Sequence, residues 1–129
     1  MAYVNPDTVH LHSLALACYE ASKAKGFYAP GPNSESLPLK LVLIHSEISE
    51  ALEELRKNPD PRLLYFREAD HKPEGFLFEI ADVIIRCLDL VGYLYATDKE
   101  PIGLPDFELL LLQKMAFNAT RPNKHGKAF

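Results

Sequence analysis

The chain has 129 residues, of which 47% are hydrophobic and 25% are charged, and its formal net charge is −4 at pH 7. This length and composition are typical of one soluble globular domain, which we take to be residues 1–129. This acidic balance shows that the surface as a whole is not a nucleic-acid footprint, and we expect no nucleic-acid partner.

Prolines and glycines divide the sequence into four predicted helices. These run from about Thr8 to Lys25, Ser36 to Asn58, Pro73 to Ala96 and Pro105 to Asn118. A polar connection from Asp60 to Lys72 precedes the third helix, and a tail from Arg121 to Phe129, predicted to be extended, follows the fourth. No segment alternates apolar and polar residues for long enough to predict a strand. The pattern predicts an all-α fold with a four-helix, bundle-like domain.

Several features favour a cytoplasmic protein with no membrane partner. Cys18 and Cys87 lie within apolar helical patterns, which predicts buried thiols rather than a disulfide or a metal pair. The N-terminal residues show no basic start followed by an apolar core, so no secretory signal is predicted. The most apolar stretch, Gly75 to Ala96, carries four charged residues, which disfavours a membrane span.

The predicted second helix carries acidic residues beside its apolar face. At about 100° per residue, that apolar face consists of Leu41, Ile44, Ile48, Ala51, Leu52 and Leu55. Glu47, Glu50 and Glu54 flank it, and Glu47 and Glu50 project from adjacent turns because they are three residues apart. Taken alone, this pattern is more typical of a solvated acidic flank than of a functional site.

The predicted third helix is apolar around almost its whole circumference, which predicts burial on most of its sides. One narrow polar stripe interrupts it and consists of Glu79, Asp82, Arg86, Asp89 and Tyr93. Buried carboxylates are costly unless they are paired or bound to metal, and Arg86 can neutralise only one neighbour along the stripe. A divalent cation would hold the remaining acids ionised, whereas the alternative is an exposed stripe of salt bridges.

The two acidic pairs, Glu47-x-x-Glu50 and Glu79-x-x-Asp82, can face each other across an antiparallel pair of helices. Carboxylate oxygens suit Mg²⁺ rather than zinc. Because Mg²⁺ usually takes one or two protein carboxylates, four of them indicate more than one ion or shared ligands, with water and substrate phosphates completing the shell. We therefore hypothesise a magnesium site at these four residues.

Three segments resemble the MazG family of nucleoside triphosphate pyrophosphohydrolases, namely Leu43–Glu53, Lys72–Gly75 and Glu79–Arg86. The family motif is a Glu-x-x-Glu helix followed by a Glu-x-x-Asp helix. Lys23–Tyr28 and Arg121–Gly126 are similar to segments of small single-domain members, so the resemblance spans residues 20 to 127. One departure is Ser46, which stands where many members carry a further glutamate.

The resemblance implies an all-α bundle completed by oligomerisation into a dimer or a tetramer. It also implies Mg²⁺-dependent hydrolysis of a (deoxy)nucleoside triphosphate to the monophosphate and pyrophosphate, with Mn²⁺ as an alternative ion and nucleotide-pool housecleaning as the role. Carried over residue by residue, Glu47, Glu50, Glu79 and Asp82 become the metal ligands and the catalytic carboxylates. The preferred base and sugar, the number of ions and the carboxylate that activates water stay open.

The C-terminal segment has the opposite charge. No acidic residue occurs from Gln113 to Phe129, whereas Lys114 and Arg121 are basic, and Lys114 shares a helix face with Asn118. From the residues alone, contact with nucleotide and a solvated basic tail are equally open interpretations. The family resemblance favours nucleotide binding by Lys114, Asn118 and Arg121, through phosphate or base. The aromatic pair Phe27–Tyr28 is interpreted as a loop anchor rather than a base-stacking surface.

Two other functions compete with this hypothesis. A carboxylate-bridged di-iron bundle needs two Glu-x-x-His motifs, and the sequence offers only Glu68 to His71, within the polar connection. A non-catalytic helical adaptor, which uses the acidic stripe as a partner interface, is the alternative that the sequence leaves open.

Overall fold

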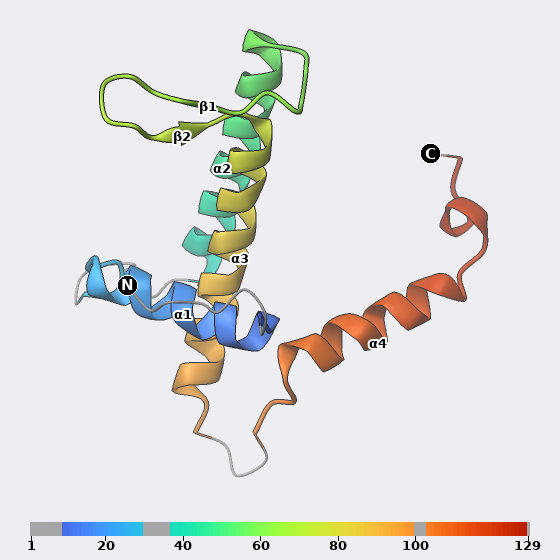
Figure 1. Cartoon of the computed structure of the whole chain (residues 1–129). Coiled ribbons are helices and arrows are strands. Elements are labelled where there is room, and N and C mark those ends of the chain that lie inside the picture. The colour runs from blue at the N-terminus through green and yellow to red at the C-terminus, as the bar shows by residue number, and fades with distance from the viewer. Residues whose placement is uncertain (1–8, 30–36, 100–102, 129) are drawn as a thin grey trace.

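The computed structural model describes residues 9–29, 37–99 and 103–128, and these residues are mostly helical (Figure 1). Their elements are α1 (Leu11–Ala24), α2 (Leu37–Lys57), β1 (Tyr65–Phe66), β2 (Pro73–Glu74), α3 (Phe76–Thr97), α4 (Phe107–Ala119) and the 3₁₀ helix η2 (Asn123–Gly126). The all-α prediction is confirmed. The predicted helix starts at Thr8 and Ser36 lie outside the described residues. In the described segments, no helix has both the length and the apolar character that crossing a membrane requires.

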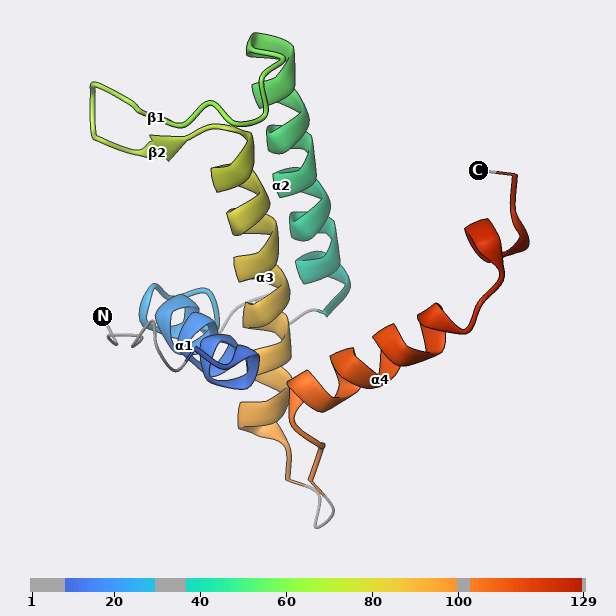
Figure 2. The ribbon, with the colours of Figure 1, turned by 45° about the vertical axis from the view of Figure 1, so that its right-hand side comes forward.

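The central helix is α3, and both α1 and α2 pack against it. α2 runs antiparallel beside its first half, whereas α1 crosses it nearer its C-terminal end (Figures 1 and 2). The crossing is close at Gly92, because a Cβ atom there would lie 2.0 Å from the carbonyl oxygen of Ala15. Glycine is therefore required where the two helix backbones meet.

The connection between α2 and α3 contains a short antiparallel strand pair that the sequence did not predict, in which Tyr65 pairs with Glu74. The Tyr65 hydroxyl donates to Glu54 Oε2 at 2.9 Å, which ties the strand pair to α2. Gly75 follows with φ at 127°, and a Cβ atom there would lie 2.3 Å from the carbonyl oxygen of Leu63. This backbone bend explains why α3 begins at Phe76 instead of at Pro73.

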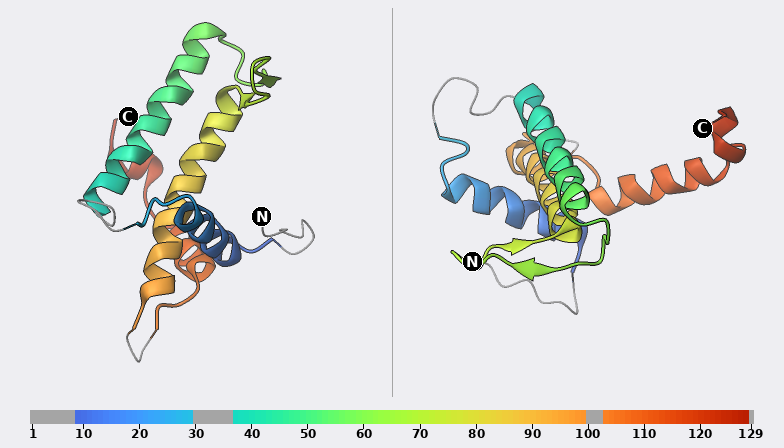
Figure 3. Two further views of the ribbon diagram at one scale, coloured as in Figure 1. Left: turned by 90° about the vertical axis from the view of Figure 1, so that its left-hand side faces the viewer. Right: turned by 90° about the horizontal axis from the view of Figure 1, so that it is seen from above.

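α4 stands apart from the other helices. It starts beside α1 and then leads away from the rest of the molecule (Figures 1 and 2, and Figure 3, right). Its start is held by the backbone N–H of His12, which donates to Glu108 Oε1 at 2.7 Å, and by the Tyr95 hydroxyl, which donates to the carbonyl of Pro105. None of its described residues is buried. The described residues therefore do not close a bundle of four helices.

The most unusual feature is that α2 and α3 pair through their acidic sides. The buried residues of α2 are Glu47, Ala51 and Glu54, and those of α3 are Glu79, Leu88, Asp89 and Gly92. Leu41, Ile48 and Leu52, which were predicted to form the core face of α2, are instead 53%, 48% and 50% exposed. That prediction is wrong for these three residues, because α3 contacts the neighbouring acidic side of the helix.

The outer side of α3 is likewise uncovered. Leu77 and Ile84 are each 50% exposed, so the prediction of burial on most sides is wrong for the single chain. Cys87 is exposed, which corrects the prediction of a buried thiol. Cys18 is partly buried, and both cysteines are free. The prediction of an extended tail is wrong for Asn123–Gly126, which form η2.

Candidate functional site

Three of the four predicted metal ligands gather between α2 and α3. Glu47, Glu50 and Glu79 each offer a carboxylate oxygen, and these oxygens all lie within 4.8 Å of one another. The three-residue spacing on α2 places Glu47 and Glu50 on adjacent turns, and the antiparallel α3 brings Glu79 opposite them. Oxygens on opposite sides of one Mg²⁺ lie about 4.2 Å apart, so small side-chain adjustments would place these three around one ion.

Glu79 is the most buried member of the cluster, at 3% exposure. Its Oε2 atom is buried without a hydrogen-bond partner among the described residues, while its Oε1 lies 3.9 Å from Nζ of Lys72. Burial raises the pKa of the Glu79 carboxyl above its ordinary value, and repulsion from Glu50, Asp82 and Glu47 adds to the rise, whereas Lys72 opposes it. A cation would satisfy the unpaired oxygen and remove this electrostatic cost, so the residues present fit a divalent metal.

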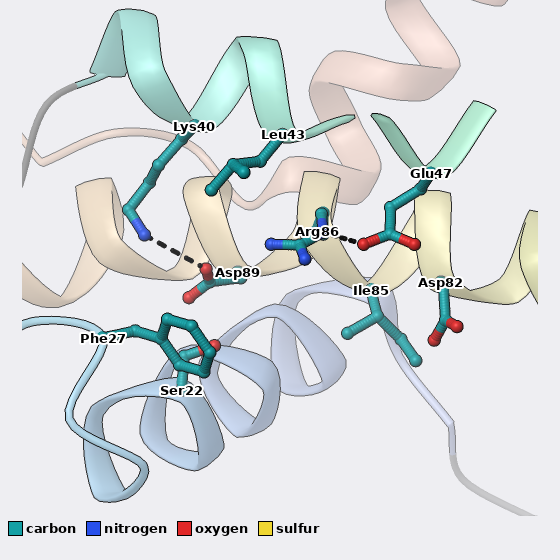
Figure 4. A pocket seen from close by; sticks show the side chains of 9 residues that line it. All are labelled: Ser22, Phe27, Lys40, Leu43, Glu47, Asp82, Ile85, Arg86 and Asp89. Atoms are coloured by element: carbon teal, nitrogen blue, oxygen red, sulfur yellow. Dashed lines mark hydrogen bonds and ion pairs between the residues drawn. The ribbon is translucent and has the colours of Figure 1, made fainter. Parts of the chain in front are cut away.

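Asp82, the fourth predicted ligand, lies beside this group rather than within it. It faces an adjoining cavity that Glu47 also lines (Figure 4). Burial, and then the charge of Glu47, raise the pKa of the Asp82 carboxyl above its ordinary value. Asp82 therefore belongs to the same electrostatic unit but is further from the position that the three glutamates define.

The cavity has a volume of about 300 Å³ and lies between α1, α2 and α3. Its lining residues are Ser22, Phe27, Lys40, Leu43, Glu47, Asp82, Ile85, Arg86 and Asp89. Glu47 and Asp82 occupy one end, Lys40 and Asp89 occupy the other, and Arg86 lies between them (Figure 4). The cavity thus extends from the acid cluster to a region lined by the basic side chains of Lys40 and Arg86 and by apolar side chains such as Leu43.

Arg86 pairs across the helices instead of along its own stripe. Its Nε donates to Oε1 of Glu47 on α2. The sequence had suggested that Arg86 neutralises a neighbouring acid of the stripe, but no such ion pair occurs among the described residues. The acid cluster therefore contains one carboxylate that a cationic side chain already holds.

Asp89, the last acid of the stripe, is held by two partners that were not predicted from the sequence. Lys40 Nζ lies 3.4 Å from its Oδ2, and the Tyr28 hydroxyl donates to its Oδ1 at 2.8 Å. The Tyr28 ring stacks on Tyr93 with a centroid separation of 5.2 Å, and burial, followed by the bond to Asp89, raises the pKa of Tyr28. Tyr28 is thus the loop anchor that was predicted, whereas its neighbour Phe27 is exposed at the cavity.

The predicted nucleotide-binding residues of the C-terminal segment are not brought to the acids within one chain. Lys114 and Asn118 lie on α4, which leads away from α2 and α3 (Figure 2), and Arg121 follows α4 in the sequence. Lys114 lies beside the Phe117 ring, with Nζ 5.4 Å from the ring centroid. Oδ1 of Asn118 is buried and has no hydrogen-bond partner in the described part of the chain.

Neither a family model, nor a curated protein, nor a solved structure matches this chain. The resemblance to the MazG family therefore depends on the quoted residues, and the geometry of the acid cluster stands independently of it.

Proposed function

We propose that the chain is a Mg²⁺-dependent nucleoside triphosphate pyrophosphohydrolase whose site is formed by Glu47, Glu50, Glu79 and Asp82. The main support is the environment of Glu79, which is almost fully buried, has an unpaired Oε2 atom among the described residues and lies beside two further glutamates. A buried polar atom without a partner costs about 1–3 kcal/mol, and a divalent cation offsets that cost. Carboxylate oxygens favour Mg²⁺, with Mn²⁺ as the alternative.

The chemistry follows from the position of the carboxylates beside the cavity. When bound, Mg²⁺ offsets the charge of the triphosphate and of the leaving pyrophosphate. Glu47, Glu50 and Glu79 hold the cation, and the carboxylate that is left free accepts a proton from the attacking water. Water adds across the α–β phosphoanhydride bond, which yields a nucleoside monophosphate and pyrophosphate. Asp82 lies outside the group of three glutamates and lines the cavity, so it is the carboxylate placed to accept this proton.

We also propose that the chain works as a homodimer or homotetramer. Apolar side chains on α2, α3 and α4 are exposed to solvent in the single chain. They include Leu52, Ile84, Leu109 and Phe117. Exposed apolar patches of this kind are typical of association surfaces, and a second copy supplies an apolar partner. The same association would bring the α4 segment of one chain towards the cavity of another, where Lys114, Asn118 and Arg121 would contact the nucleotide.

A panel of ribo- and deoxyribonucleoside triphosphates tests the proposal directly. The wild-type protein is expected to release pyrophosphate from at least one of them with Mg²⁺ and from none of them with excess EDTA. The panel also identifies the preferred base and sugar. A non-catalytic adaptor would release no pyrophosphate from any nucleotide under either condition.

A further inference from the structure

Arg86 lines the middle of the cavity, and it holds one of the predicted metal ligands, Glu47 (Figure 4). Its Nε bonds to Glu47, whose carboxylate oxygens also lie close to those of Glu50 and Glu79. The Arg86 side chain is 34% exposed, whereas that of Glu47 is 10% exposed. The buried Glu47 carboxylate therefore has two candidate partners. One is the Arg86 guanidinium, and the other is a cation bound by the three glutamates.

The guanidinium has unused donors on the cavity side. Of the five N–H groups of an arginine, the pair with Glu47 uses the one on Nε. Within residues 9–29, 37–99 and 103–128, Arg86 makes no other hydrogen bond, and Figure 4 shows its terminal nitrogens turned away from Glu47. Lys40, the other cation that lines the cavity, is already paired with Asp89 at 3.4 Å. Arg86 is thus the better-placed donor for an incoming anion.

We propose that Arg86 and a divalent cation compete for Glu47, and that cation binding releases Arg86 to hold a phosphate oxygen of a triphosphate in the cavity. This inference rests on the proposed function of the acid cluster. In the metal-free protein, Glu47 neutralises Arg86 and the neighbouring acids repel an anion. When Glu47 turns to the cation, the planar guanidinium is free to make the paired contacts with phosphate that suit arginine.

The exchange couples the two ligands. Cation binding frees the Arg86 guanidinium, so it increases triphosphate affinity by more than the attraction between the cation and the triphosphate alone would. By linkage, triphosphate binding increases cation affinity by the same factor. A triphosphate that arrives without metal is therefore held weakly. Arg86 acts in this scheme as a phosphate-binding residue whose availability is set by Glu47.

Two carboxylate variants provide a matched test that needs no metal. Glu47→Gln and Glu50→Gln each remove one negative charge from the same cluster, but only Glu47 is bonded to Arg86. Binding of inorganic tripolyphosphate is measured by calorimetry in excess EDTA. We expect Glu47→Gln to bind tripolyphosphate about tenfold more tightly than Glu50→Gln, the gain that one charge-assisted contact of about 1.4 kcal/mol provides. The double variant Glu47→Gln/Arg86→Gln should lose this gain.

Equal tightening in both single variants would overturn the exchange, because it would show the effect of charge removal alone. Survival of the gain in the double variant would overturn it as well. A titration of the wild-type protein with Mn²⁺ separates this inference from the proposed function. Absence of Mn²⁺ binding overturns the exchange, whereas Mn²⁺ binding together with the expected tripolyphosphate pattern supports it even if no nucleotide is hydrolysed.

Discussion

The α2–α3 pair and α4 are both rich in leucine, yet only the pair contains buried residues. In the pair, the buried residues include Glu47, Glu54, Glu79 and Asp89, and contacts within the chain fix each of them. In α4, Leu109 and Leu112 are each 59% exposed, and none of the described residues of this helix is buried. Contacts within the chain hold the acidic side chains of the pair in place, whereas the described residues give α4 little to pack against.

This difference indicates how the two regions should respond to change. Substitutions in the acid cluster should act on metal binding and chemistry in any state of assembly. Substitutions on the apolar outer surfaces should act through association, and those on the basic part of α4 should act on nucleotide affinity once association has occurred. Four predictions test this separation, from the largest expected effect to the smallest.

Removal of a cluster carboxylate should have the largest effect. Glu79→Gln, Glu50→Gln and Asp82→Asn should each lower nucleotide hydrolysis by more than about a hundredfold, since even groups that only support a metal ligand contribute about 10- to 100-fold. Glu53→Gln is the matched control, because Glu53 lies on the same helix, is exposed and pairs with Arg56. Steady-state pyrophosphate release measures the rates. Mg²⁺-dependent turnover retained in all three variants would reject the metal assignment.

The metal-free stability should reveal the cost of burying Glu79. Because the folded-state pKa of Glu79 is raised, ionised Glu79 destabilises the fold above that pKa, and the penalty disappears below the ordinary pKa of the unfolded chain. Glu79→Gln should therefore melt at a higher temperature than the wild type at about pH 8, and the difference should shrink towards about pH 4. Thermal melting in EDTA measures this. A difference that grows as the pH falls would contradict the assigned direction.

Association should depend on the outer face of α2. Leu52 and Leu64 are each 50% exposed, but Leu52 lies on α2 and Leu64 in the α2–α3 connection. Leu52→Glu should weaken dimer or tetramer formation about tenfold or more, the loss expected from one buried leucine, whereas Leu64→Glu should not. Sedimentation velocity at micromolar concentration measures the assembly state. A stable and active wild-type monomer would show that activity needs no association and would reject the proposed oligomer.

The smallest effect is expected at the C-terminal segment. Lys114→Ala and Arg121→Ala should raise KM by about tenfold for each 1.4 kcal/mol of nucleotide binding lost, with little change in Mn²⁺ affinity without nucleotide. Deletion from Pro122 onward should have a similar or smaller effect, and Lys127→Ala serves as an exposed control. If these variants keep the wild-type KM and kcat, the segment is a solvated tail, and Arg86 becomes the main phosphate contact.

The sequence predicted the helices well, because local residues determine their ends. Prolines and glycines gave all four helices to within a few residues where the structure describes them. The packing side of α2 could not be predicted in the same way. Its apolar face and its acidic flank are adjacent, and amphipathic spacing does not reveal whether a leucine such as Leu52 meets the same chain or another one.

Only part of the candidate site could be predicted, because local spacing places residues on one helix but does not show how two helices align. The three-residue spacing on α2 places Glu47 and Glu50 on adjacent turns, and the expected antiparallel pairing of the two helices brings Glu79 opposite them. Asp82 lies beside this group. The ion pairs that shape the site were not predictable, because Arg86 and Glu47 are 39 residues apart and Lys40 and Asp89 are 49 apart. Such partners are set by how α2 and α3 align, which no local pattern encodes.

Product analysis by ³¹P NMR tests the central claim most directly. The wild-type protein and the Glu53→Gln control are incubated with the preferred triphosphate and Mg²⁺, beside Glu79→Gln and an EDTA sample. We expect resonances of a nucleoside monophosphate and of pyrophosphate in the first two samples and intact triphosphate in the others. Intact triphosphate in every sample, or the appearance of nucleoside diphosphate and inorganic phosphate, would contradict a pyrophosphohydrolase site at Glu47, Glu50, Glu79 and Asp82.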